Sequence, residues 1–281
     1  MKILLAIIGF MSISMIGFGQ SNHISEKNSS RNKLYIYWGW NWSSYTKSSI
    51  RFQGDNYDFT LANVLATDRP SKFSLDTYFN PTKFTIPQYN VRVGYSFREK
   101  WDISLGIDHM KYVVQQNQLV NISGNIENTN SIYDGTYSDE NILIVPDFLT
   151  FEHSDGLNYV NVELRHSNKI FHLNPFTMSL IKGGGIGVLV PKTNVTLLGY
   201  DRYNKFHVSG YGMSLTAGLR LTFHNKFFVQ SEMKGGFIDL PDVRTTMSKA
   251  DRANHHFFFS QLNIVFGGMI NLRPKKRKQN P

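Results

Sequence analysis

The chain has 281 residues, of which 41% are hydrophobic and 14% aromatic, and its formal net charge is +9. It contains no cysteine, which excludes disulfides, thiolate metal sites and a lipid-modified N-terminal cysteine. Much of the positive charge lies in a terminal run, Arg273–Lys278. The rest of the chain is too weakly basic for a broad nucleic-acid-binding face, so we expect no nucleic-acid partner.

Residues 1–19 have the features of a cleaved secretory signal peptide. Lys2 supplies a positive charge, residues 3–18 are almost wholly apolar, and Gly17 and Gly19 are small residues before a predicted cut. The apolar stretch, roughly 16 residues, is short for a membrane-spanning helix of about 20. We therefore predict a leader over 1–19 and one domain over 20–281.

Residues 208–238 carry the longest alternating pattern in the chain. From Tyr211 to Phe223 every second residue is apolar, and the residues between them are small or polar, with one arginine, Arg220. Three residues, 224–226, separate this run from a second alternating run at 227–238. The first run is longer than an ordinary strand of about five or six residues. Such a hairpin is typical of a membrane-spanning β-barrel.

Six further segments show strand-like alternation. The segment at 176–190 is less regular, because simple alternation places Lys182 on the apolar face beside Gly183–Gly185, and we expect a register change there. The segment at 33–42 ends in three tryptophans, which suit a membrane interface. The six segments are 33–42, 86–97, 101–113, 157–166, 176–190 and 257–272.

Short and long connections alternate strictly between these segments. Outer-membrane barrels have short periplasmic turns and long extracellular loops, so both termini are expected in the periplasm. The predicted fold class is all-β: an eight-stranded antiparallel up-and-down transmembrane β-barrel with long extracellular loops.

Ten strands remain an alternative. Residues 50–61 resemble a hairpin about Asp55 and Asn56, and residues 142–151 resemble another strand. The arms of the hairpin are only about five residues long, whereas a span needs about 9–11. We therefore expect both segments to be extracellular extensions of the sheet.

In its leader, its alternating spans and its alternating turns, the chain resembles the small monomeric outer-membrane β-barrel family that includes the OmpA transmembrane domain and OmpX. The resemblance covers about residues 33–272. It implies a monomer in the outer membrane of a Gram-negative cell envelope, in contact with outer-membrane lipids and lipopolysaccharide and inserted by the barrel assembly machinery. Such barrels usually end on an aromatic residue, whereas this chain continues into a basic tail, 273–281. The segment recognised by the machinery is then expected within 263–272.

The inward-facing positions of the predicted strands combine four cations with four anions. An eight-stranded barrel has a lumen that side chains fill, so these charges must pair. The near balance of charge favours a buried plug over a narrow ion path, which would have a lining of one sign. The inward charges are Arg92, Arg165, Arg220, Lys234, Asp102, Asp108, Glu163 and Glu232.

No catalytic, cofactor-binding or metal-binding residue is assigned, and no cofactor is expected. Residues 165–168 superficially resemble the His-x-Ser-Asn motif of outer-membrane lipid A deacylases, but the intervening residue is missing, and adjacent strand residues face opposite sides. The pair His255-His256 beside Asp251 is a weak pattern for a metal. A rim site would need convergence that sequence does not show; its candidates are His109, His153, His207, His255, His256, Asp155 and Ser209.

The predicted function is therefore non-enzymatic: envelope structure, or binding of an extracellular ligand through long loops rich in Asn, Ser, Asp and Tyr. Two alternatives remain open, a lipid A- or phospholipid-modifying enzyme with a rim site and a small-solute pore.

Overall fold

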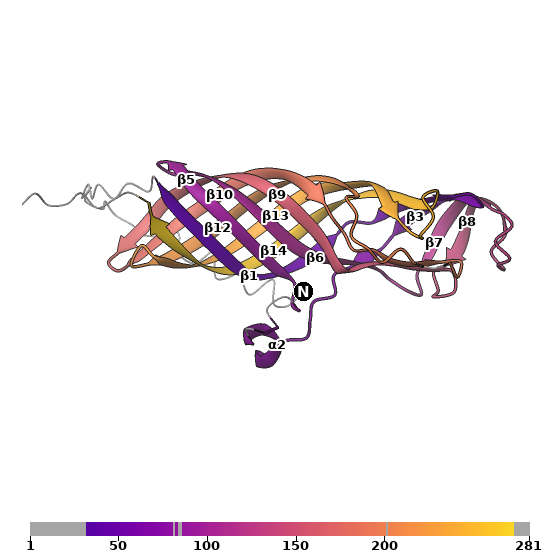
Figure 1. Ribbon diagram of the computed structural model, residues 1–281, viewed down its shortest axis with the longest axis horizontal. Coiled ribbons are helices and arrows are strands. Elements are labelled where there is room, and N and C mark those ends of the chain that lie inside the picture. The colour runs from indigo at the N-terminus through magenta and orange to yellow at the C-terminus, as the bar shows by residue number, and fades with distance from the viewer. Residues whose placement is uncertain (1–31, 81, 84–85, 201, 273–281) are drawn as a thin grey trace, which may run out of the picture.

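The body of the protein is a closed ring of eight antiparallel strands (Figure 1). The computed structural model describes residues 32–80, 82–83, 86–200 and 202–272, so the predicted leader (1–19) and basic tail (273–281) lie outside the described residues. All eight predicted spans are strands of the ring. In ring order these are β1 (Lys33–Tyr45), β5 (Tyr89–Arg98), β6 (Trp101–Val114), β9 (Leu149–Leu173), β10 (Phe176–Leu189), β12 (Gly210–Phe223), β13 (Phe227–Arg244) and β14 (Arg252–Asn271), which pairs back onto β1.

Three short turns close one end of the ring, which we call the turn end. They join β5 to β6, β9 to β10, and β12 to β13. Lys100, His224 and Asn225 adopt positive φ values in these turns, which allows the chain to reverse tightly. The first residue of β1 pairs with the last of β14, so the ring begins and ends here too (Figure 1). The three predicted short turns are confirmed, but the alternation is not strict, because β13 ends at Arg244 and β14 already begins at Arg252.

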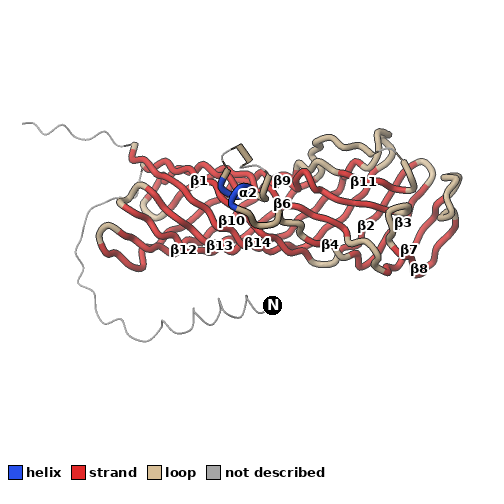
Figure 2. Tube along the Cα trace, turned by 90° about the horizontal axis from the view of Figure 1, so that it is seen from below, coloured by secondary structure: helices blue, strands red, loops and turns tan. Residues whose placement is uncertain are grey.

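At the opposite end the sheet continues beyond the ring, and we call this part the extension (Figures 1 and 2). Here β14 pairs with β2 (Ser48–Gly54), followed in order by β3 (Tyr57–Val64), β7 (Leu119–Ile126) and β8 (Gly135–Leu143). Two short strands flank the ring strands, β4 (Ala66–Thr67) on β6 and β11 (Asn194–Leu197) on β9. The connections predicted as long loops are therefore largely sheet.

Of the two extra segments that the sequence predicted, a hairpin at 50–61 and a strand at 142–151, the structure contains only the hairpin. The hairpin at 50–61 is present as β2 and β3. The single strand predicted at 142–151 is wrong, because β8 ends at Leu143 and β9 begins at Leu149. Between them the chain makes a turn that buries Ile144 and Phe148 completely, so this apolar run fills a core instead of alternating along a strand.

The interior changes character along the axis. In the turn-end half, most side chains that point inward are polar or charged, beside a small apolar cluster that includes Phe228 and Val265. The extension instead encloses a continuous apolar core. Aromatic rings stack through that core, including Phe52 on Phe59 and Tyr112 on Phe257. The extension is therefore built like a water-soluble β-protein, with its apolar side chains inside.

The outer face of the ring shows the reverse distribution. Large apolar side chains point outward and remain exposed, such as Leu215 at 75% and Ile186 at 70%. A soluble monomer rarely exposes so continuous an apolar surface, whereas a barrel in hydrocarbon requires it. No described helix is long and apolar enough to cross a membrane. We call this surface the apolar belt; it includes Val93, Ile103, Leu105, Val162, Leu164, Ile186, Met213, Leu215, Val229, Met233, Phe258 and Phe266.

The register change expected at Gly183–Gly185 is not present. Pairing of β10 with both neighbours is unbroken there, and Lys182 lies exposed on the outer face. A Cβ at Gly183 would come within 2.7 Å of the Leu164 carbonyl oxygen, so the glycines permit a close approach of β9 instead of a bend. The shift lies nearer the turn end, where Ile170 of β9 is skipped. The long stem of Lys182 allows its ammonium to reach toward water.

A short helix not expected from the sequence, α2 (Leu75–Phe79), lies outside the barrel wall (Figures 1 and 2). Its N-cap is Ser74, whose side chain accepts a hydrogen bond from the Thr77 amide. Tyr78 and Phe79 pack against the outward-facing Trp40 at ring-centroid distances of 5.5 and 5.3 Å. This aromatic cluster suits a membrane interface, where such rings are most favourable.

The apolar belt predicts the effect of one charged substitution. Leu215→Arg is expected to lower the free energy of unfolding in lipid vesicles by about 2–4 kcal/mol, because it moves a cation into hydrocarbon. The matched control is Leu119→Arg on the extension, whose side chain is similarly exposed, at 65%, and which should change stability by no more than about 0.5 kcal/mol. Equal, small effects of the two substitutions would contradict a lipid-covered belt.

Candidate functional site

A network of three cations and three anions fills the middle of the ring, and Glu163 of β9 is its centre. Its carboxylate oxygens lie 2.8 Å from Arg92, 2.8 Å from Lys234 and 2.7 Å from Arg165. Glu163 and Arg165 are fully buried, and Arg92 and Lys234 are only 1% exposed. The cations come from β5, β9 and β13, so the network ties separate walls of the ring together.

The other two anions complete the charge balance. Asp108 contacts Lys234 and accepts a 3.0 Å hydrogen bond from Asn161. Glu232 pairs with Arg165 at 3.2 Å and accepts a 3.0 Å hydrogen bond from Asn263. Each buried charge thus has an opposite partner, which offsets its loss of hydration.

Tyr37 links the network without carrying charge. Its hydroxyl oxygen accepts hydrogen bonds of 3.0 Å from both Arg92 and Arg165. Its bridging role depends on side chains from two other strands, β5 and β9.

The two remaining inward charges, Arg220 and Asp102, lie nearer the turn end and form no ion pair with each other. Asp102 accepts a 2.5 Å hydrogen bond from the Tyr35 hydroxyl. Arg220 donates to Gln230 at 2.6 Å and lies over the Phe228 ring at 4.5 Å. The predicted buried plug is confirmed for six of the eight charges, which pair directly with one another.

The candidate rim residues do not assemble into a nucleophile and base. His207 Nε2 lies 2.9 Å from Asp242, but the Ser209 hydroxyl donates to the backbone oxygen of His207 and not to its ring. Asp242 was not among the predicted residues, because it lies on another strand, β13, with no local signal. Asp155 forms an ion pair with Lys192 at 2.7 Å.

The other histidines are occupied by structural contacts or point apart. His109 is hydrogen-bonded to Asn158 at 2.8 Å and stacks on Tyr89. His255 points into the apolar core whereas His256 is exposed on the outer face, so the two cannot share a metal. In the described part of the chain, no three His, Cys, Asp or Glu side chains gather as a metal site. His166, of the deacylase-like motif, packs on Trp101 at the turn end.

Two histidines are buried in the apolar core of the extension, beyond the apolar belt. His153 is hydrogen-bonded to Thr193 at 3.0 Å, and its ring stacks on that of His255 at 6.2 Å. Neither ring nitrogen of His255 has a hydrogen-bond partner among the described residues. Burial lowers the pKa of His153 to about 3, and burial together with the nearby His153 and His256 lowers the pKa of His255 well below its usual value.

Comparison with solved structures finds small outer-membrane β-barrel proteins. OprG from Pseudomonas aeruginosa is 12% identical with a TM-score of 0.42, covering 86% of this chain and 97% of its own. AlkL, solved in DMPC lipid bilayers, is 9% identical with a TM-score of 0.40, and the match covers 92% of this chain and 99% of AlkL. Ail of Yersinia pestis, solved with the heparin analogue sucrose octasulfate, is 10% identical with a TM-score of 0.31, and the match covers 85% of this chain and 99% of Ail.

No protein-family model matches the chain, and no curated protein matches it in sequence. The TM-scores lie below 0.5, and it is the apolar belt of this chain itself that indicates a membrane location.

Breaking the charge network is expected to destabilise the barrel strongly. Glu163→Gln leaves three buried cations with two anions and should lower the free energy of unfolding in vesicles by about 3–5 kcal/mol. Adding Lys234→Met restores neutrality and should recover a substantial part of that loss. A double variant as unstable as the sum of both single variants would contradict the coupling, as measured by urea unfolding.

The buried histidines predict a loss of stability in mild acid. An unfolded histidine has a pKa of about 6.5, so the unfolded chain binds more protons than the fold between that value and the lowered folded pKa. The stabilisation is complete above pH about 6.5 and is lost as pH falls, by about 1.4 kcal/mol per pH unit for each group.

His255→Phe should therefore reduce the pH dependence of thermal unfolding, measured by near-ultraviolet circular dichroism between pH 7.5 and 5. The control is His172→Phe, an exposed position near the turn end and remote from the buried pair, which should keep the wild-type slope. The interpretation fails if both variants retain that slope.

Proposed function

We propose that this protein is a non-enzymatic outer-membrane barrel that holds the extension outside the cell as a binding surface. The observation that carries the proposal is the combination of a filled interior with a protruding sheet. With the extension outside the cell, the turn end faces the periplasm. The cleaved leader 1–19 then delivers the chain to the periplasm, and the tail 273–281 remains in the periplasm.

The interior supports a binding role over a pore. The network around Glu163 and the apolar core of the extension fill the ring at two successive levels. A conducting path needs a hydrated lining, which neither level offers.

The surface of the extension carries a distinctive charge. Between Lys111 and Arg165 the sequence has no lysine or arginine. The acidic side chains of its outer part are all exposed, and none of them forms an ion pair with a described residue. We call this surface the acidic tip; it comprises Glu127, Asp134, Asp139, Glu140 and Asp147. Unpaired charge of one sign attracts a partner of the opposite sign.

The outermost strand also has an open edge. Within the described chain, β8 pairs with β7 on one side and with no strand on the other. Its unpaired backbone groups can accept an added strand, and Asp139 and Glu140 on that strand disfavour self-association. The partner that best fits the edge and the charge is an extended, cationic segment of another protein.

Binding of a cationic probe tests this proposal. The purified barrel should bind a lysine-rich peptide with an affinity that falls as salt increases, and Asp139→Asn/Glu140→Gln should weaken binding at least fivefold. The control, Asp76→Asn/Glu99→Gln, makes the same charge change away from the acidic tip and should bind as the wild type does. If both variants lost the same affinity for the peptide, binding would depend only on net charge and not on the acidic tip, which would overturn the proposal.

Planar-bilayer recording distinguishes the proposal from a pore. The wild-type protein should give no discrete conductance steps, because the Glu163 network blocks the ring. Regular single-channel steps from the wild type would favour the small-solute pore instead.

A further inference from the structure

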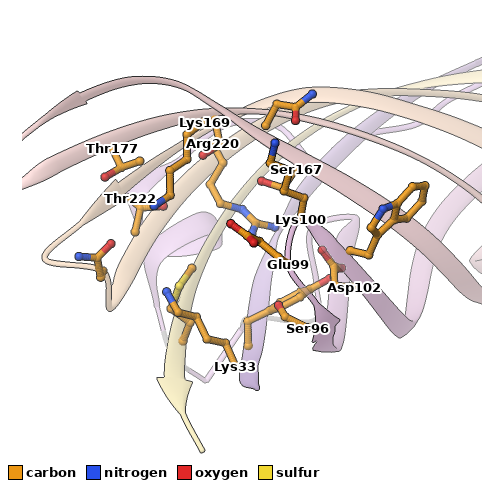
Figure 3. A pocket seen from close by; sticks show the side chains of 16 residues that line it. Lys33, Ser96, Glu99, Lys100, Asp102, Ser167, Lys169, Thr177, Arg220 and Thr222 are labelled. Atoms are coloured by element: carbon orange, nitrogen blue, oxygen red, sulfur yellow. The ribbon is translucent and has the colours of Figure 1, made fainter. Parts of the chain in front are cut away.

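A polar pocket of about 390 Å³ opens at the turn end of the barrel, below the buried charge network (Figure 3). It is lined from several strands of the ring and by the turn between β5 and β6. Its volume is more than ten times the roughly 30 Å³ that one water molecule occupies in the liquid, so it has room for a small solute.

The pocket carries an excess of positive charge. Four cations line it, Lys33, Lys100, Lys169 and Arg220, and none of them forms an ion pair with a described residue. Two acidic residues, Glu99 and Asp102, also line the pocket. Asp102 already accepts a hydrogen bond from the Tyr35 hydroxyl. Unlike the neutral network above it, this group of charges is not balanced from within the protein.

Arg220 gives the pocket a built binding group. It is only 7% exposed, and its position is fixed by the 2.6 Å hydrogen bond to Gln230 and by packing on Phe228. Its Nη2 is buried and has no hydrogen-bond partner among the described residues. In Figure 3 the Arg220 side chain reaches from the wall into the middle of the pocket. A buried guanidinium with an unpartnered donor is costly, and an oxyanion in the pocket would stabilise it through a charge-assisted hydrogen bond to the part of the group that faces the pocket.

Hydroxyl groups lie beside this cation. Thr177, Ser179 and Thr222 line the same pocket and are each less than a tenth exposed. A hydroxyl both donates and accepts hydrogen bonds, so these groups suit the polar body to which an anionic group is attached.

We propose that the turn-end pocket binds the phosphate or carboxylate group of a small polar solute, with Arg220 as the central contact. Lys33, Lys100 and Lys169 at its mouth attract the anion, and the hydroxyls receive the rest of the molecule. This inference does not depend on the acidic tip or on its partner, so either proposal can fail alone.

Isothermal titration calorimetry in a phosphate-free maltoside detergent tests the pocket. The probes are glucose 6-phosphate, inorganic phosphate and acetate, with glucose as the neutral comparison. Saturable binding of a phosphate probe identifies a phosphate site, saturable binding of acetate alone identifies a carboxylate site, and glucose should not bind. Absence of saturable binding for all three anions overturns the proposal.

Variants locate the binding. Arg220→Met should lower the affinity at least tenfold, and Arg202→Met, an exposed position at the extension, should leave it unchanged. Lys100→Gln and Lys169→Gln change exposed side chains and should fold normally, so they test the pocket even if Arg220→Met does not fold. Each should weaken binding two- to fivefold, and unchanged affinity in both would overturn the assignment.

Discussion

The carboxylate of Glu163 holds three cations in a space that water does not reach, and the rest of the barrel depends on that arrangement. A strand ring in hydrocarbon must satisfy its polar groups internally, because lipid offers no hydrogen bonds. Its lumen faces the same restriction when side chains fill it. Three cations and three anions meet both demands, since their net charge is zero and each has a partner at close range.

The barrel is therefore organised in successive levels along its axis. A cationic pocket lies at the turn end, the neutral network comes next, an apolar core fills the extension, and unpaired acids occupy its tip. The network and the core make the cylinder rigid and closed, and function is consequently expected at its two ends. That arrangement resembles a scaffold whose binding groups are placed on the outermost elements.

Alternation of period two was enough to predict the eight ring strands and the inward direction of Arg92, Glu163 and Lys234, because each strand has only two faces. It did not predict which charges meet, since the contacts of Tyr37 and Asp242 join strands far apart in the sequence. It failed at 142–151, where Ile144 and Phe148 turn into a core. The helix α2 was missed because five residues packed on Trp40 carry no periodic signal of their own. In the turn-end pocket, Lys33, Lys100 and Lys169 are separated in sequence and become neighbours only when the ring closes.

The most direct test of the account is a single-cysteine scan along β12, which the absence of native cysteine makes simple. Spin labels placed from Tyr211 to Phe223 in lipid bilayers should alternate in their accessibility to oxygen, which concentrates in hydrocarbon. Labels at Met213, Leu215 and Leu221 should be accessible to oxygen and shielded from a water-soluble nickel reagent, whereas inward labels should be shielded from both. Outward labels that respond to the nickel reagent as strongly as to oxygen would show that water, and not lipid, covers the ring, and would contradict the account.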